Sequence, residues 1–288
     1  MKEYTGDKIR NVAIVGHGGA GTTSLTEALL YRSGAISRMC KVEDGQTTTD
    51  FEPEEIKRGV SVSATLAPVE WNDVKINFLD TPGFADFVAE VKGAFRAVDS
   101  VLIVVSATSG VQIGTEQCWN LAEEAGLPRL IFVNKMDREN ADFDQIKMVE
   151  AAVEADDEVM EKYLEGEEIP DNVIMNCLVK GIRQGIIFPV LCGSAYKNIG
   201  LGRCLNAIVN YTFPSVLNDF EVENPTTGKT EVRDSNAPMA ALVFKTTADP
   251  FVGRLSFVRV FSGAISADSA VYNASREEME KVGPVFTL

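Results

Sequence analysis

The chain has 288 residues, 45% hydrophobic and 24% charged, which is ordinary for a folded globular protein and too apolar for a disordered one. No apolar run reaches the roughly eighteen residues of a membrane span, and the polar N-terminus lacks a signal peptide, so we expect a cytoplasmic protein. The net charge of −15 argues against a general nucleic-acid binder, and five cysteines without a Cys-x-x-Cys pair argue against a zinc site.

The first part of the chain alternates short apolar runs with helical patterns. The polar residues 35–60 have no sustained period and predict a long functional loop, while Asn72-Asp73 suits a hairpin turn. We expect strands at 11–15, 61–69, 74–79, 101–106 and 130–133, helices at 22–33, 84–98 and 111–125, and a last strand–helix pair that follows residues 186–191 and ends near Tyr211. This order predicts an α/β fold with a doubly wound, mostly parallel sheet covered on both faces.

The composition changes near Pro214. Residues 214–237 are rich in charges and turn residues and predict a linker with room for one hairpin. From residue 238 onward the pattern is β, and we expect strands at 240–246, 255–261, 270–272 and 282–287. The sequence therefore predicts a first domain over 1–213 and an incomplete β-barrel over 238–288. Because such a barrel cannot close before residue 288, we expect the chain to be truncated there.

A glycine-rich stretch joins the first strand to the first helix. Residues 16–23 read GHGGAGTT and fit the spacing G-x-x-x-x-G-K-[ST], with Thr22 in place of the Lys. Backbone N–H groups in such a loop, at the start of a helix, can bind phosphate, although a plain tight turn gives a similar pattern. The candidate phosphate-binding residues are Gly16, His17, Gly18, Gly19, Ala20, Gly21, Thr22, Thr23 and Ser24.

A second motif, Asp80-Thr81-Pro82-Gly83, ends another predicted strand. The Asp80 carboxylate can approach a magnesium ion through water, and the Gly83 N–H can meet a γ-phosphate. Because the carboxyl ends of parallel strands share one edge of a sheet, this motif is expected beside the glycine-rich loop.

Two further motifs end the later strands and suit a guanine base. In Asn134-Lys135-Met136-Asp137, Asn134 can reach guanine N7, Lys135 can pack over the base, and Asp137 can accept two guanine N–H bonds. In Cys192-Gly193-Ser194-Ala195, a backbone N–H of Ser194 or Ala195 can meet guanine O6. Four such motifs in order, each at the end of a strand, predict a guanine-nucleotide site.

From about residue 8 to 288 the chain resembles the translational GTPases of the elongation factor G type. The resemblance rests on TTSLTEALLY at 22–31, DTPG at 80–83 with Asp86-Phe87, NKMDR at 134–138 and GSAYKN at 193–198. It implies a P-loop GTPase domain followed by a β-barrel domain, GTP or GDP with Mg²⁺ as ligands, and the ribosome as partner of a monomer. It also implies Thr23, Ser61 and Asp80 as metal ligands. The family's insert after about residue 145 is shortened or missing, so the chain runs almost directly into a predicted acidic helix at 153–164.

Two catalytic positions depart from the family's pattern. Thr22 replaces the Lys that neutralises the phosphates, and Phe84, after Gly83, replaces the His that orients the attacking water. We therefore expect a GTP-binding elongation factor that acts in translocation but hydrolyses GTP slowly. The alternatives are a non-hydrolysing ribosome-binding paralogue and a ribosomal protection protein of the tetracycline-resistance type. For Phe84 the plain alternative is a core residue that packs with Phe87.

Overall fold

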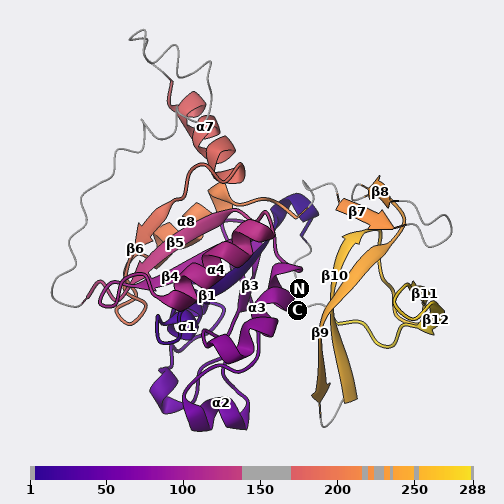
Figure 1. Ribbon diagram of the computed structural model, residues 1–288, viewed down its shortest axis with the longest axis horizontal. Helices are drawn as coiled ribbons and strands as arrows, with labels where there is room; N and C mark the ends of the chain where they lie inside the picture. The colour runs from indigo at the N-terminus through magenta and orange to yellow at the C-terminus, as the bar shows by residue number, and fades with distance from the viewer. Residues whose placement is uncertain are drawn as a thin grey trace. The chain divides into compact units, whose positions relative to one another are not determined.

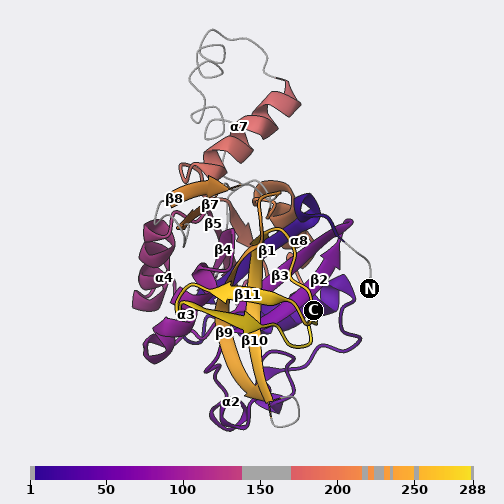
Figure 2. The ribbon, with the colours of Figure 1, turned by 90° about the vertical axis from the view of Figure 1, so that its right-hand side faces the viewer.

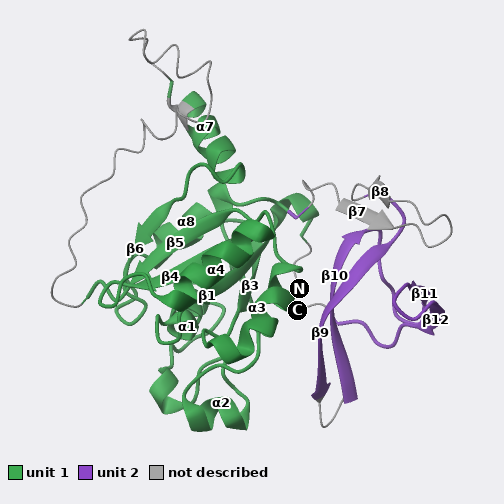
Figure 3. Ribbon diagram, in the orientation of Figure 1, with its two compact units in different colours: residues 1–214 green, residues 215–288 purple. Residues whose placement is uncertain are grey.

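The computed structural model describes residues 4–137, 170–215, 220–223, 230–233, 236–249 and 253–286 (Figure 1). The chain divides into two compact units, Met1–Pro214 and Ser215–Leu288, which Figure 3 colours separately. The predicted acidic helix at 153–164 and the expected shortening after residue 145 lie outside the described residues. Within the described residues, no helix is both long and apolar enough to cross a membrane.

A six-stranded sheet forms the centre of the first unit, in the order β2-β3-β1-β4-β5-β6. Its strands are β1 (Ile9–Gly16), β2 (Thr65–Trp71), β3 (Val74–Asp80), β4 (Ser100–Ser106), β5 (Arg129–Asn134) and β6 (Val190–Cys192). All neighbouring pairs are parallel except β2 and β3, which are antiparallel. Their connection is the predicted turn, in which Asn72 and Asp73 both have positive φ, at 49° and 61°. The predicted α/β fold with a mostly parallel sheet is confirmed.

Helices cover both faces of this sheet, which explains why its central strands are largely apolar. Helices α3 (Val88–Phe95) and α4 (Ile113–Glu124) lie on one face, and α8 (Leu201–Tyr211) lies on the other (Figures 1 and 2). Helix α1 (Thr22–Ser33) packs with α8, and the two share one core with Phe78 and Phe132 of the sheet. Every residue of β4 is buried, as expected for a parallel strand covered twice.

Several helices differ from the sequence-based expectation. The predicted helix at 84–98 is a 3₁₀ turn, Ala85–Phe87, followed by the shorter α3. The polar loop (residues 35–60) contains the short helix α2 (Pro53–Arg58), and α7 (Asp171–Arg183) precedes β6. Two further 3₁₀ turns are Gly6–Lys8 and Val42–Asp44.

The described residues of the second unit form three antiparallel strand pairs. These are β7 (Phe220–Glu223) with β8 (Thr230–Arg233), β9 (Ala240–Asp249) with β10 (Gly253–Ser262), and β11 (Ala270–Asn273) with β12 (Glu278–Lys281). The predicted strand at 282–287 is wrong: its described residues, 282–286, are not in a strand, and β11 pairs with the charged segment before them. A tight turn between β11 and β12, with Glu277 at φ 57°, brings the charged segment into register.

Candidate functional site

The glycine-rich loop joins the end of β1 to the start of α1 and requires glycine at several positions. Gly19 and Gly21 have φ of +86° and +94°, a conformation that side chains disfavour. A Cβ on Gly21 would lie 2.7 Å from Nδ2 of Asn134, and one on Gly16 would lie 2.7 Å from the carbonyl oxygen of Val104. The loop is therefore packed closely against the ends of β4 and β5.

Helix α1 begins in this loop with its first N–H groups uncapped by a side chain. Such a helix start is a site for anions. Thr22 and Thr23 are buried there, at 8% and 6% exposure, so the side chain at the lysine position of the motif is a small, neutral one. A cation reaches the loop from the end of β5, where Lys135 Nζ donates to the carbonyl oxygen of Gly19 at 2.7 Å. His17 lies against Gly114 at the start of α4.

Hydroxyl and carboxylate groups gather beside the start of α1. The hydroxyls of Thr23 and Ser61 lie 2.9 Å apart, and the Thr49 hydroxyl donates to Asp80 Oδ2 at 2.8 Å. The structure thus brings together the three predicted metal ligands and adds Thr49 and Asp50. Asp80 Oδ1 and Asp50 Oδ2 are buried and have no hydrogen-bond partner among the described residues.

The two carboxylates of this cluster are held in surroundings that disfavour their charged forms. Burial raises the pKa of Asp80 to about 7, and the negative charge of Asp50 adds to the rise, against the hydrogen bond from Thr49. Burial also raises the pKa of Asp50, although the hydroxyls of Ser61 and Thr23 oppose it. Two buried carboxylates with unused oxygens, beside two hydroxyls, form an all-oxygen donor set of the kind that Mg²⁺ prefers. The residues present therefore fit a magnesium ion.

Sequence reasoning missed Thr49 and Asp50 because they belong to no motif. They lie in the polar loop, where Thr and Asp are frequent and have no periodic pattern. The available signal was the short run Thr47-Thr48-Thr49-Asp50, a concentration of oxygen donors in a loop already expected to be functional.

The predicted base-binding motifs meet at the ends of β5 and β6. Asn134 Oδ1 accepts the backbone N–H groups of Lys135, at 2.8 Å, and of Ala195, at 3.0 Å, while its Nδ2 donates to the carbonyl oxygen of Ala20 at 3.2 Å. Asn134 thereby ties the glycine-rich loop to both base-binding motifs.

A second contact aligns the two base-binding motifs with each other. The Ser194 hydroxyl donates to Asp137 Oδ1 at 2.6 Å and accepts the Lys197 N–H at 3.1 Å. This leaves the Asp137 side chain exposed but oriented, as a carboxylate that reads a base edge must be.

Gly83 and Phe84 contact the glycine-rich loop from the end of β3. A Cβ on Gly83 would lie 2.9 Å from the backbone nitrogen of Gly18 and 3.0 Å from the oxygen of Gly16, so the two turns are in direct contact. The Phe84 ring lies over Gly18, where an added Cβ would come within 3.0 Å of the ring. A side chain at position 18 would therefore press against the Phe84 ring.

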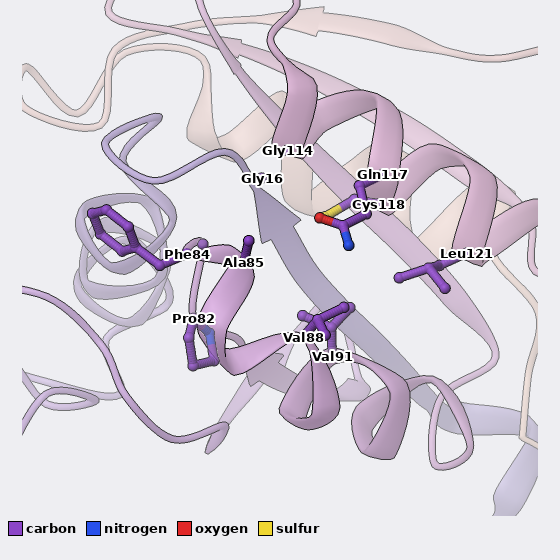
Figure 4. Close-up of a pocket in the computed structure, with 11 residues that line it drawn as sticks. Gly16, Pro82, Phe84, Ala85, Val88, Val91, Gly114, Gln117, Cys118 and Leu121 are labelled. Atoms are coloured by element: carbon purple, nitrogen blue, oxygen red, sulfur yellow. The ribbon is translucent and has the colours of Figure 1, made fainter.

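Phe84 is not a core residue. The residue is 46% exposed, and although it borders the pocket between α3 and α4, its ring extends away from the other lining side chains (Figure 4). Gly83 also lines that pocket, together with side chains that include Val88, Val91 and Leu121. The alternative of a buried Phe84 that packs into the core with Phe87 is therefore wrong.

Two family models match the chain, and its structure is similar to solved structures. The family model described as the elongation factor Tu GTP binding domain matches residues 7–214, and the model of elongation factor G domain 2 matches residues 238–288. A crystal structure of a protein from Thermus thermophilus is similar, with 30% sequence identity and a TM-score of 0.80. The match covers 96% of this chain and 48% of that one, so the chain spans about half the length of the solved relative.

Proposed function

Because this chain belongs to the translational GTPases, with the GTP-binding domain of the elongation factor Tu family and domain 2 of elongation factor G, we propose that it is a guanine-nucleotide-binding factor of the elongation factor G type. In this proposal it binds GTP and GDP with Mg²⁺, acts on the ribosome in translocation, and hydrolyses GTP slowly. A ribosomal partner would place it in the cytoplasm. The observation that carries the proposal is the meeting of four motif-bearing loops at one edge of the sheet.

Base recognition follows from the contacts of Asn134 and Asp137. Asn134 is 2% exposed, and hydrogen bonds to the backbone of Ala20, Lys135 and Ala195 fix its side chain before any ligand arrives. The Asp137 carboxylate, held at one oxygen by Ser194, is the acceptor for the two N–H donors of guanine. Adenine presents no such pair of donors, and this difference favours GTP over ATP.

Phosphate and metal binding follow from the start of α1 and the cluster around Asp80. The uncapped N–H groups of α1 and the glycine-rich loop bind the phosphates. Thr23, Ser61 and Asp80 are the proposed magnesium ligands, directly or through water, with Asp50 close by. Bound Mg²⁺ supplies positive charge that neutralises phosphate oxygens and the two carboxylates.

Slow hydrolysis is proposed from two side chains. Thr22 brings no charge to the phosphates, whereas a charge-assisted hydrogen bond there contributes about 1.5–3 kcal/mol. The Phe84 ring, which lies over Gly18, can exclude water from the γ-phosphate side of the loop but has no group that can orient a water molecule. The missing charge at Thr22 weakens both nucleotide binding and stabilisation of the transition state, whereas the missing water-orienting group at Phe84 acts on the transition state.

Single-turnover hydrolysis of radiolabelled GTP, with and without ribosomes, tests the proposal. We expect saturable GTP binding and a rate that ribosomes raise little. Binding without any hydrolysis would favour the non-hydrolysing ribosome-binding alternative, which the contact between Phe84 and Gly18 supports. Fast ribosome-stimulated hydrolysis would reject the assignment of slow catalysis while leaving guanine-nucleotide binding in place.

A further inference from the structure

Glutamate side chains hold the polar loop and the segment that follows it, residues 61–64. Glu27 of α1 is 1% exposed, and its two oxygens accept the backbone N–H groups of Cys40, at 3.1 Å, and Thr48, at 2.8 Å. These bonds fix the first half of the loop to a helix that begins at the glycine-rich loop. They do not involve the turn at Gly83.

The segment after the polar loop is held from the short helix α2 within that loop. Glu55 of α2 is also 1% exposed, and its Oε1 accepts the N–H groups of Val62, at 2.9 Å, and Ser63, at 3.2 Å. This contact joins the polar loop to the segment directly after it, so it shapes that segment without connecting it to the turn at Gly83.

Glu90 makes a contact of a different kind. It lies on α3, the helix that follows the Asp80–Gly83 turn, and its Oε2 accepts the Ala64 N–H at 2.8 Å and lies 3.5 Å from the Ser63 hydroxyl. Ala64 comes three residues after Ser61. The Glu90 carboxylate thus joins the segment that carries a proposed metal ligand to the segment that carries Gly83.

We propose that Glu90 is a positioning residue that couples these two segments, so that they take up their GTP-binding arrangement together. The inference rests on the proposed binding of guanine nucleotides. Both segments face the third phosphate in that proposal, one through Ser61 and the metal and the other through the Gly83 N–H. Two coupled segments contribute more binding free energy to GTP than two independent segments do. GDP lacks the third phosphate and therefore does not engage either segment in this way.

The test compares the affinities of the whole chain for GDP and for a non-hydrolysable GTP analogue, both with Mg²⁺, by isothermal titration calorimetry. The variants are Glu90→Ala, which removes the acceptor, and Glu90→Gln, which keeps an amide oxygen for the Ala64 N–H. Glu124→Gln, at an exposed position of α4, controls for the loss of one negative charge. We expect Glu90→Ala to weaken binding of the GTP analogue on the order of tenfold with little change for GDP. Glu90→Gln should restore most of this loss.

Trypsin supplies a second measurement of the same coupling. Arg58 is exposed at the end of α2 and offers a cleavage site inside the polar loop. The GTP analogue should protect Arg58 from cleavage in the unmodified chain and in Glu90→Gln, but not in Glu90→Ala.

The possible outcomes separate this inference from the proposed function. Equal weakening of GDP and GTP-analogue binding by Glu90→Ala, or no weakening of either, overturns the coupling role alone. A lack of guanine-nucleotide binding by the unmodified chain overturns the proposed function, and the coupling role with it.

Discussion

Asp137 Oδ1 accepts a hydrogen bond of 2.6 Å from the hydroxyl of Ser194, which joins two sequence motifs that lie 57 residues apart. The bond orients the carboxylate without burying it, because Asp137 remains exposed. In the proposed function, this carboxylate accepts the two N–H donors on the edge of guanine.

Asp137→Asn should therefore shift preference from guanine toward xanthine nucleotides. An amide presents a donor to the base edge, and xanthine presents an oxygen where guanine has its amino group. Leaving a donor of guanine unpaired costs about 1–3 kcal/mol, so binding of GDP should fall about five- to hundredfold. Competition of GDP, xanthosine diphosphate and ADP for a fluorescent guanine nucleotide measures this. If the unmodified chain binds ADP and GDP with equal affinity, the assignment of Asp137 to the base is wrong.

Thr22→Lys should strengthen binding of GTP more than binding of GDP. The added ammonium group would lie at the start of α1, where it can reach the β- and γ-phosphates, and one charge-assisted hydrogen bond contributes about 1.5–3 kcal/mol. We expect about a ten- to hundredfold gain for a GTP analogue. Titration calorimetry measures it, and Thr22→Met, which adds length without charge, is the control. An equal gain from the Met variant would assign the effect to packing.

Gly21→Ala should weaken nucleotide binding as well as stability. Gly21 has φ +94°, and an added Cβ would lie 2.7 Å from Nδ2 of Asn134. Gly34→Ala is a matched control, because Gly34 also has positive φ, at +81°, while an added Cβ there meets no atom of the described residues within 4 Å. Each variant should lose about 1–2 kcal/mol in urea unfolding, since a left-handed residue with a side chain is strained. Equal GDP affinities for the two variants would show that the contact between position 21 and Asn134 does not affect nucleotide binding.

The sequence predicts well the sheet and the gathering of the motif-bearing loops at one edge of it, because both have strong local signals. The predicted helix at 22–33 matches α1 to the residue, since the glycines at 21 and 34 mark its ends. Parallel strands buried on both faces are recognisable as continuous apolar runs, as in β4. The positions of Asn134 and Asp137 at the edge of the sheet could be predicted because Asn134 ends strand β5 and Asp137 comes three residues later.

The features that were missed have weak or misleading local signals. Helix α2 is too short for a periodic pattern, although Pro53 at its first position and the pair Glu52 and Glu55 form a recognisable capping box. Strand β12 is charged at nearly every position, so the apolar residues after it were the better strand candidate. Thr49 and Asp50 reach Asp80 and Thr23 through the path of a long loop, which no spacing rule predicts.

Glu27→Ala should release the polar loop and expose Cys40 to thiol reagents. The substitution leaves the N–H groups of Cys40 and Thr48 without their acceptor. We expect Cys40 to be alkylated several-fold faster, as followed by peptide mass spectrometry. Glu27→Gln, which keeps one carbonyl oxygen, should have a smaller effect, and Cys192, also half-buried, supplies the internal reference rate. Faster alkylation of both cysteines would indicate general unfolding and would remove the evidence for a local tether.

The buried thiols of Cys118 and Cys204 serve as a control at raised pH for the alkylation experiment. Burial raises the pKa of Cys118 to about 11 and that of Cys204 to about 12, from an ordinary value of 9. Because the reactive form is the thiolate, both should stay unmodified at pH 8 to 9 while the chain is folded. Because both folded-state pKa values are raised, the stability linked to these thiols is fully present below pH 9 and is lost as the pH rises through the folded-state values. Early labelling of Cys204 would contradict its burial in the core.

Thr22→Lys and Phe84→His should together accelerate GTP hydrolysis by much more than the product of their separate effects. Phe84 lies over Gly18 and is 46% exposed, so an imidazole fits the same space and adds nitrogen atoms that can hold a water molecule. Alone, it would orient water toward phosphates that still lack a positive side chain. The Lys alone would neutralise charge without a positioned nucleophile. Groups that act on one transition state are non-additive in this way.

The measurement is single-turnover hydrolysis of radiolabelled GTP by the unmodified chain, both single variants and the double variant, with ribosomes present. Phe84→Leu in the Thr22→Lys background is the control, because it opens the space over Gly18 without adding a polar group. We expect the His-containing double variant to exceed this control by at least about tenfold, within the usual contribution of a positioned acid–base group. If the Leu and His variants are equally fast, then Phe84 limits hydrolysis by obstructing the site, and the absence of a water-orienting group is not the cause.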